Sequence, residues 1–403
     1  MSAKLPEFPK EHYPDDLELK LLQIVHRHGE RAPVRRRLEK LVPAVWNLCD
    51  ANASMFATIA EFNRQKITHH HVPVERVLET DTTESKQVPI PSGGCYYGQL
   101  TTLGRYRMNT LGQHLRAFYI DKLKFLPDVY DEETTYLRSS DYPRTQESIQ
   151  QLVGGGLYPQ DKRPMDFTGF QLRVRDPRDD LMFPNPMCYK LRSLSKQFTQ
   201  KVAELTQEQC KSISDRLRDH VEDVSLTSHP SANGILDTLV AAKVHGYDLP
   251  QEIDDQLLHD LEDVVVKEWF YGAMVSADVR RLGLGRLMGV IRDRMVRKQE
   301  QREKTKLAVY SGHDTTVGPL LILLNAFDQR WPPFGSAVLF ELFQQTSTQQ
   351  HFVRVKYNEK TLKLPGCQSK GNHKEGDPTL CTLEAFKAIV QDQIPMDWEK
   401  ECN

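Results

Sequence analysis

Residues Leu17–Pro33 read LELKLLQIVHRHGERAP, and this stretch indicates how the chain folds. Its first part, Leu17–His26, is a short apolar run that includes β-branched Ile24 and Val25, which is typical of a buried strand in an α/β sheet. The charged segment Arg27–Pro33 follows at once, so it lies where that strand ends. Ligand sites of open α/β sheets lie just outside the carboxyl ends of the strands. The stretch therefore predicts an α/β fold with a functional site at this strand end.

The overall composition is that of a globular protein. Of 403 residues, 39% are hydrophobic and 27% are charged, and 53 basic against 55 acidic residues give a net charge of −2. No global field then attracts nucleic acid or an anionic membrane surface, and we expect neither as a partner. No apolar run of about 18 residues is present, so no membrane-spanning helix is expected. The sequence does not determine the oligomeric state.

The N-terminal segment and the cysteines bear on the compartment. Residues Met1–Asp16 carry several charges and three prolines but no apolar core of a signal peptide. We therefore expect a cytoplasmic protein, with an organelle or secretion by an unrecognised route as the alternative. The seven cysteines are scattered and odd in number, so reduced structural thiols are expected.

Further elements follow from hydrophobic periodicity. Strands are expected at Thr135–Arg138, Thr305–Ser311, Ala337–Phe343 and His351–Tyr357. Helices are expected at Thr102–Lys124, Thr145–Val153 (ended by Gly154, Gly155 and Gly156) and Val317–Ala326, with a helical patch near Leu41–Arg64 and turns at Thr80–Gly94. The expected organisation is an α/β core formed by 17–160 and 300–403, a mainly helical cap inserted at 160–300, and an excursion at 35–95 that contributes to the pocket rim.

The charged segment after the first strand has the groups that phosphoryl transfer needs. A neutral His28 imidazole can attack phosphorus, while the guanidinium groups of Arg27 and Arg31 bind phosphate oxygens. The same arginines lower the pKa of His28 and keep it nucleophilic. Gly29 is expected to let the backbone approach the ligand, and Pro33 to stiffen the loop. A flanked histidine alone is more often a surface residue, so the full spacing behind a buried strand carries the prediction.

Two later segments complete the set. His313 and Asp314 follow another apolar strand at a helix start, where the imidazole could donate to phosphate and the carboxylic acid could reach the leaving group. The alternative makes Asp314 only the helix N-cap. In the segment Arg138–Arg144, we expect Arg144 to bind phosphate and Arg138 to be a structural ion-pair partner.

Together these segments resemble the histidine acid phosphatases, branch 2 of the histidine phosphatase superfamily. The resemblance rests on Arg27–Pro33, Gly98–Gly104, Leu137–Thr145 and His313-Asp314, in the family's order. The tail, with Arg330–Phe334, Pro365-Gly366-Cys367 and Leu380-Cys381, looks like the lysophosphatidic acid phosphatase type 6 subgroup.

The resemblance implies a mixed central sheet with helices on both faces, as in phosphoglycerate mutase, plus a helical cap. It implies that His28 becomes a phosphohistidine and that Asp314 protonates the leaving oxygen. It further implies that four residues hold the phosphate: Arg27, Arg31, Arg144 and His313. No cofactor and no metal are implied. Members of this family usually enter the secretory pathway or an organelle, where Cys367 and Cys381 could pair.

The remaining signals leave alternatives open. The sequence His69-His70-His71 is interpreted as a solvated loop and not as a metal site. Glu30 is expected to offset part of the arginine field. The expected substrate is a small phosphate monoester, with a lysophospholipid as one candidate. A phytase-like or other phosphomonoesterase and a catalytically silent phosphate-binding protein are the alternatives.

Overall fold

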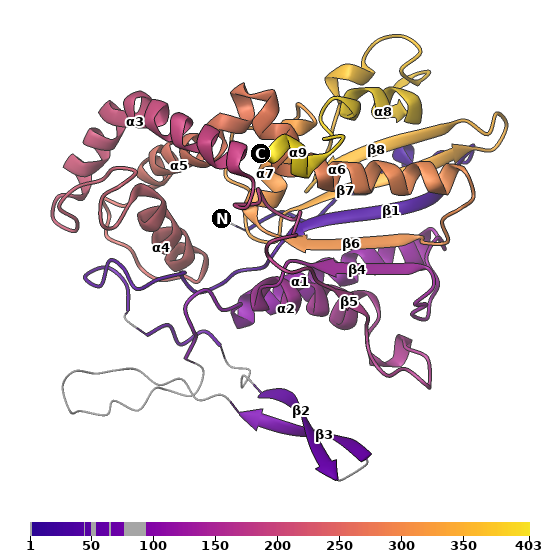
Figure 1. Ribbon diagram of the computed structural model, residues 1–403, viewed down its shortest axis with the longest axis horizontal. Coiled ribbons are helices and arrows are strands. Elements are labelled where there is room, and N and C mark those ends of the chain that lie inside the picture. The colour runs from indigo at the N-terminus through magenta and orange to yellow at the C-terminus, as the bar shows by residue number, and fades with distance from the viewer. Residues whose placement is uncertain (1, 44, 50–53, 64–65, 76–93) are drawn as a thin grey trace.

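A mixed sheet lies at the centre of the computed structural model (Figure 1), which describes all residues except 1, 44, 50–53, 64–65 and 76–93. Its nine strands in the described chain are β1 (Leu17–Arg27), β4 (Thr135–Ser139), β5 (Leu172–Arg173), β6 (Leu307–Gly312), β7 (Ala337–Gln345), β8 (His351–Tyr357), β9 (Lys360–Thr361), β10 (His373–Lys374) and β11 (Asp377–Thr382). Their order is β10-β11-β8-β7-β1-β6-β4-β5, with β9 beside β8. Strands β1, β6, β4 and β5 run parallel, while β7 and β8 are antiparallel to their neighbours. The mixed α/β fold is thus confirmed, as are the four predicted strands after the first.

Helices cover both faces of this sheet (Figure 1). The α-helices of the described chain are α1 (Thr102–Leu115), α2 (Pro143–Gln150), α3 (Tyr189–Leu217), α4 (Ala232–Val244), α5 (Asp255–Val275), α6 (Ala277–Gln299), α7 (Asp314–Leu323), α8 (Leu383–Gln391) and α9 (Trp398–Cys402). The side chains of β1 contribute to two separate hydrophobic cores, one on each face of the sheet, because successive strand residues point to opposite faces. Leu21 and Val25 pack with α6, α7 and α8, while Leu22 and Ile24 pack with α1 and the turns that follow α1 and α2.

The segment from 160 to 300 is mainly helical, as predicted. Helices α3, α4 and α5 share a hydrophobic core of their own, which also takes in Leu38, Val42 and Trp46. Helix α6 instead contributes Leu284 and Ile291 to the core on the face of the sheet that carries Leu21 and Val25. The proposed division of the chain into core, cap and rim stays a prediction. No helix in the described part of the chain is long and apolar enough to cross a membrane.

The region near 41–64 does not form the expected helix. It contains strand β2 (Ser54–Asn63), which pairs antiparallel with β3 (Lys66–Glu75) in a separate two-stranded sheet (Figure 1). The apolar residues between 55 and 62 fit either periodicity, and a short run cannot distinguish a helix from a strand. The histidines His69–His71 lie in β3, so the expectation of a loop at these residues is wrong. Most of the turn-rich stretch Thr80–Gly94 lies outside the described residues.

The three glycines after α2 have a different role from the one predicted. The chain does not stop there but continues as a π-helix, Gln151–Leu157. A Cβ on Gly156 would lie 2.5 Å from the Cα of Gly112 in α1, and one on Gly112 would lie 2.0 Å from the carbonyl oxygen of Leu152. The glycines therefore let two helices cross at close range, and the expectation of a helix stop is wrong.

The cysteines are mostly paired, so the expectation of reduced thiols is wrong. Three disulfides join Cys49 to Cys95, Cys188 to Cys402, and Cys367 to Cys381. The first links the chain on either side of the β2–β3 hairpin, and the second ties the start of α3 to the last helix. Among the described residues, Cys210 is the free cysteine and is buried. Partners distant in sequence, up to 214 residues apart, leave no local pattern that could reveal them.

Candidate phosphate-transfer site

Three parallel strands end side by side at one edge of the sheet and position the predicted site. Arg27 of β1 lies beside Gly312 of β6, and β4 lies on the other side of β6. The backbone N–H of His28 donates to the carbonyl of Gly312 at 3.0 Å, and that of Ser140 donates to the carbonyl of Ser311 at 3.1 Å. These bonds continue the strand pairing into the loops. The loops that carry His28, Ser140 and the residues after Gly312 are therefore held together by the sheet.

His28 is buried, and a hydrogen bond to its neighbour determines which ring nitrogen carries the proton. Its Nδ1 lies 2.8 Å from the carbonyl oxygen of Gly29, which can only accept, so Nδ1 carries the proton and Nε2 keeps the lone pair. Burial lowers the pKa of His28 well below 6.5, and the charges of Arg144, Arg27 and Arg31 lower it further. The predicted effect of the arginines is confirmed, with burial added as the largest cause.

The second histidine, His313, has its Nε2 engaged. This atom lies 2.9 Å from Ser140 Oγ, which lies 3.0 Å from Thr145 Oγ1. Thr145 Oγ1 donates its proton to backbone carbonyls, so it accepts from Ser140 Oγ. Ser140 Oγ in turn accepts from His313 Nε2, which therefore carries a proton. Burial, followed by the charge of Arg144, lowers the pKa of His313 to about 3. The two imidazole rings lie edge to face, 5.7 Å apart.

Two arginines of the first loop are each paired with a carboxylate. Arg27 Nη2 lies 3.0 Å from Asp314 Oδ2, and Arg31 Nη1 donates to Asp237 Oδ1 at 2.7 Å. Both guanidinium groups stack toward the ring of Phe334, at 4.1 and 5.5 Å from its centroid. Within the described chain, the buried Nε atoms of both arginines have no hydrogen-bond partner. Donor capacity for an anion therefore remains beside His28.

Asp314 begins helix α7, and the residue at the N-cap is His313, so the alternative in which Asp314 is merely the cap is wrong. Burial raises the pKa of Asp314, but the charges of Arg27 and Arg31 outweigh burial and hold it below its ordinary value. One oxygen accepts from the backbone N–H of Thr315 at 2.9 Å. The carboxyl group is thus fixed at the site edge, where 15% of the side chain is exposed.

The two arginines of the 138–144 segment have different surroundings, and the predicted ion pair of Arg138 is confirmed. Arg138 is paired with Asp180 at 3.2 Å, with side-chain exposures of 2% and 1%, and this pair is structural. The Arg144 guanidinium lies 4.8 Å from the ring of Tyr142, and burial lowers its pKa to about 10. In the described chain no ion pair to Arg144 is found, and its buried Nε has no partner.

Three contacts of the site have no local sequence signal. Asp237 comes from α4, 206 residues after Arg31. Ser140 lies between Arg138 and Arg144 and has no role predicted from the sequence, yet its hydroxyl is hydrogen-bonded to His313 Nε2. Gly29 has an additional packing role: a Cβ there would lie 2.6 Å from the carbonyl oxygen of Gly104, so its small size is needed for packing on α1. Glu30, next to it, is fully buried, and its charge raises the pKa of Arg27, as expected.

The comparisons with known proteins agree with this geometry. The model of the histidine phosphatase superfamily (branch 2) matches residues 18–358. The chain belongs to this family. A probable acid phosphatase of Schizosaccharomyces pombe is 32% identical, covering 100% of this chain and 97% of its own. The mouse lysophosphatidic acid phosphatase type 6 is 26% identical over 92% and 84% of the two chains.

Solved structures support the histidine phosphatase fold. A Hafnia alvei phytase in complex with tartrate has a TM-score of 0.63 at 14% identity, covering 97% of this chain and 99% of that one. A phytase from Citrobacter braakii has a TM-score of 0.61 at 15% identity, covering 96% and 99% of the two chains. At these identities the likeness shows the fold alone.

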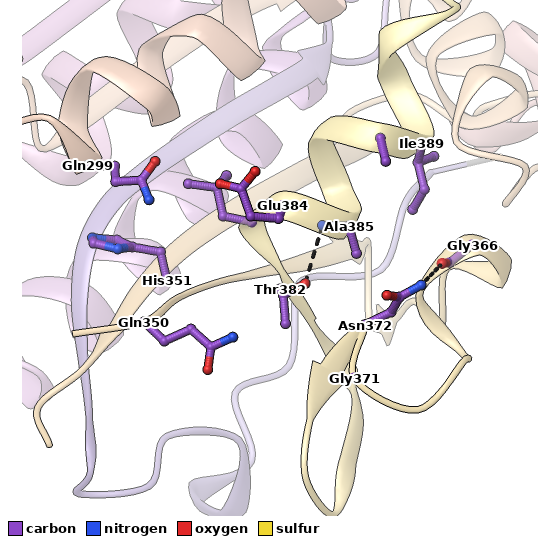
Figure 2. A pocket seen from close by; sticks show the side chains of 12 residues that line it. Gln299, Gln350, His351, Gly366, Gly371, Asn372, Thr382, Glu384, Ala385 and Ile389 are labelled. Atoms are coloured by element: carbon purple, nitrogen blue, oxygen red, sulfur yellow. Dashed lines mark hydrogen bonds between the residues drawn. The ribbon is translucent and has the colours of Figure 1, made fainter. Parts of the chain in front are cut away.

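A separate pocket of about 650 Å³ lies at the other end of the sheet (Figure 2). His351, which lines it, is the first residue of β8 and pairs with Gln344, and Gln344 pairs with Glu18 at the start of β1. The length of β1 therefore separates this pocket from His28 by about 30 Å. In the described part of the chain, no group of three or more metal-binding side chains lies together.

Proposed function

We propose that this histidine phosphatase is a metal-independent acid phosphatase that hydrolyses phosphate monoesters through a phosphohistidine on His28. The observation that carries the proposal is the buried His28 imidazole, whose Nε2 keeps its lone pair and whose pKa lies well below 6.5. Such a group stays unprotonated in mildly acidic solution, where it remains a nucleophile. The arginines beside it supply positive charge for the transferred phosphoryl group.

The reaction then has two steps. Nε2 of His28 attacks phosphorus in line, so that an N–P bond forms as the ester P–O bond breaks. Arg27, Arg31 and Arg144 bind the equatorial oxygens, and Asp314 gives its proton to the leaving oxygen. The Asp314 carboxylate next takes a proton from a water molecule that attacks the phosphohistidine, which releases phosphate and restores His28.

The proton on Asp314 depends on the bound substrate. In the free site the charges of Arg27 and Arg31 keep the pKa of Asp314 low. A bound phosphate anion offsets this positive field, which raises the pKa and favours the protonated acid. The same anion favours a second proton on His313, which would make it a donor to a phosphate oxygen. Binding of the substrate thus prepares the acid for the first step.

The test is hydrolysis of an aryl phosphate by the purified chain. His28→Ala should abolish phosphate release, whereas His229→Ala, which removes an exposed histidine, should leave the rate unchanged. EDTA should not reduce the activity. A His28→Ala variant that keeps near wild-type activity would exclude the covalent route, and loss of activity in EDTA would exclude a metal-independent one.

For the substrate, we propose a monoester with an apolar leaving group, and a lysophospholipid is our candidate. Two aromatic side chains support this choice: the rings of Tyr142 and Phe183 lie 5.0 and 6.0 Å from that of His313. Tyr142 is 40% exposed, so its ring offers apolar surface beside the phosphate site. Rates on lysophosphatidate, a sugar phosphate, phosphotyrosine and inositol hexakisphosphate should rank the lipid first. A preference for inositol hexakisphosphate would instead support a phytase-like enzyme.

For the compartment, we propose an organelle or the secretory route in place of the cytoplasm. Disulfides persist in oxidising compartments and are rare in the cytosol. The three cystines support this choice. Thiol titration of the protein from its natural source, denatured without a reductant, should find one free thiol, from Cys210. The same titration after reduction should find seven. Seven thiols before reduction would return the proposal to the cytoplasm.

A further inference from the structure

Asp237 is a buried carboxylate of helix α4 that contacts three points of the loop after His28. Its Oδ1 accepts from Arg31 Nη1 at 2.7 Å, and its Oδ2 accepts from the backbone N–H of Val34 at 3.0 Å. Oδ2 also lies 3.7 Å from Arg37 Nη1. The side chains of Asp237 and Arg31 are each 8% exposed. One carboxylate therefore fixes both the loop backbone and the guanidinium orientation.

The packing of α4 leaves little freedom for this contact. Arg37 lies against the first turn of α4, where a Cβ on Gly234 would be 2.7 Å from Arg37 Nε. The same turn is capped by Ser231, whose hydroxyl accepts from the backbone N–H of Gly234 at 3.4 Å. The loop after His28 and the first turn of α4 are thus in direct contact one turn before Asp237.

The two carboxylates of the site have different surroundings. Asp314 is paired with Arg27 but is 15% exposed, and the proposed reaction requires it to exchange protons. Asp237 instead accepts from the Arg31 guanidinium and from the backbone N–H of Val34, both in the loop after His28, and only 8% of its side chain is exposed. Its chemistry is that of a fixed anchor for a guanidinium group.

We propose that Asp237 is a positioning residue: it orients Arg31 toward the phosphoryl oxygens and links the helical segment to phosphate binding. The inference rests on the proposed phosphatase function. Asp237 occupies one Nη of Arg31 and leaves the other nitrogens of the fork for an anion. Because the anchor lies in α4 and the nucleophile follows β1, correct placement of Arg31 requires both parts of the chain.

The experiment compares wild type, Asp237→Asn and Asp237→Glu in steady-state hydrolysis of an aryl phosphate and in inhibition by inorganic phosphate. Asp255→Asn is the matched control, because Asp255 forms an exposed pair with Lys243 in the same helical segment. Loss of one charge-assisted hydrogen bond should raise KM and the phosphate inhibition constant of Asp237→Asn roughly 10- to 100-fold. The fall in kcat should be smaller, and Asp237→Glu should recover part of the affinity.

Each other outcome is also decisive. A phosphate inhibition constant within about twofold of wild type would overturn the positioning role, even if Asp237→Asn melts at a lower temperature. Tighter phosphate binding would mean that the carboxylate only repels anions, which also overturns it. The proposed phosphatase function is tested separately. It stands if the wild-type enzyme is active and His28→Ala is inactive, and both results can hold even if the inference about Asp237 fails.

Discussion

Two buried clusters of charged residues in this protein differ in net charge: one is neutral and the other has an excess positive charge. The anchor cluster consists of Tyr13, Tyr119, Glu341, Arg354, Lys356 and Asp377. In it, Glu341 accepts from Tyr13 at 2.5 Å and from Tyr119 at 2.6 Å. Arg354 pairs with Asp377 at 3.1 Å and donates to the carbonyl of His12, and Lys356 donates to that of Glu7 at 2.7 Å. Two acids match two bases, and the N-terminal segment is tied to the sheet.

The phosphate cluster consists of Arg27, His28, Arg31, Arg144, His313, Asp314 and Asp237. Its three arginines face two paired carboxylates, so one positive charge remains uncompensated within the cluster. The histidines add no charge at neutral pH because their pKa values are lowered. Removing one partner from a balanced buried cluster leaves a charge unpaired and lowers stability, whereas a cluster with excess positive charge favours an anion. The comparison predicts that substitutions in the two clusters affect different measurements.

The largest expected effect concerns Asp314. Asp314→Asn should slow hydrolysis of alkyl phosphates roughly 10²- to 10⁴-fold, because the poor leaving group needs a proton. Activated aryl phosphates should lose far less. The measurement is kcat on a series of esters with graded leaving-group pKa. Equal losses across the series would remove Asp314 from the role of acid.

In the anchor cluster, Glu341→Gln should lower the free energy of unfolding by about 2 kcal/mol, the usual scale of a hydrogen bond to a charged group. Glu18→Gln is the control, since Glu18 pairs with Lys20 on the surface with 62% of its side chain exposed. Urea unfolding followed by circular dichroism gives both values. The kcat and KM of folded Glu341→Gln should equal those of wild type, and a changed KM would contradict the separation of the two clusters.

Arg144 and Arg138 provide a matched pair within one segment. Arg144→Lys should raise the phosphate inhibition constant about tenfold, because lysine lacks the planar fork. Arg138→Lys should leave that constant unchanged but lower stability, because its partner Asp180 is buried. Inhibition and unfolding measurements on both variants check this. The assignment fails if Arg138→Lys is the variant that weakens phosphate binding.

A further expected effect is on the pH dependence of stability. The pKa of His313 is about 3 in the folded chain and about 6.5 when unfolded, so below pH 6.5 the unfolded chain binds a proton that the folded chain does not. Stability should therefore fall as pH decreases from about 6.5 to about 3. His26, buried with a pKa of about 4, acts in the same direction. His313→Asn should show a shallower fall in urea unfolding, and an unchanged fall would show that His313 titrates normally.

Much of the fold and the site could be predicted from local patterns. The strands ending in Arg27, Arg138-Ser139 and Gly312 can each be recognised from a short, largely apolar run followed by a polar loop, and the sheet brings them together. The ion pair between Arg138 and Asp180 confirms the role predicted for Arg138, whereas phosphate binding by Arg144 stays a prediction.

The rest depends on contacts between distant segments. The Asp237–Arg31 pair and the three disulfides have no local signature, because a helix face or a cysteine does not indicate its partner. Gly156 reads as a helix stop, and only the neighbouring Gly112 explains why it lies inside one. The β2–β3 hairpin has apolar spacing that fits a helix equally well, and strand pairing determines it.

The most direct test of the account is to identify the phosphorylated residue during turnover. The enzyme is mixed with a labelled phosphate monoester, quenched within one turnover under conditions that preserve phosphohistidine, and mapped by peptide mass spectrometry. We expect label on His28, whose Nε2 keeps its lone pair, and none on His313, whose Nε2 donates to Ser140. Label on His313, or no covalent label while phosphate is released, would contradict the account.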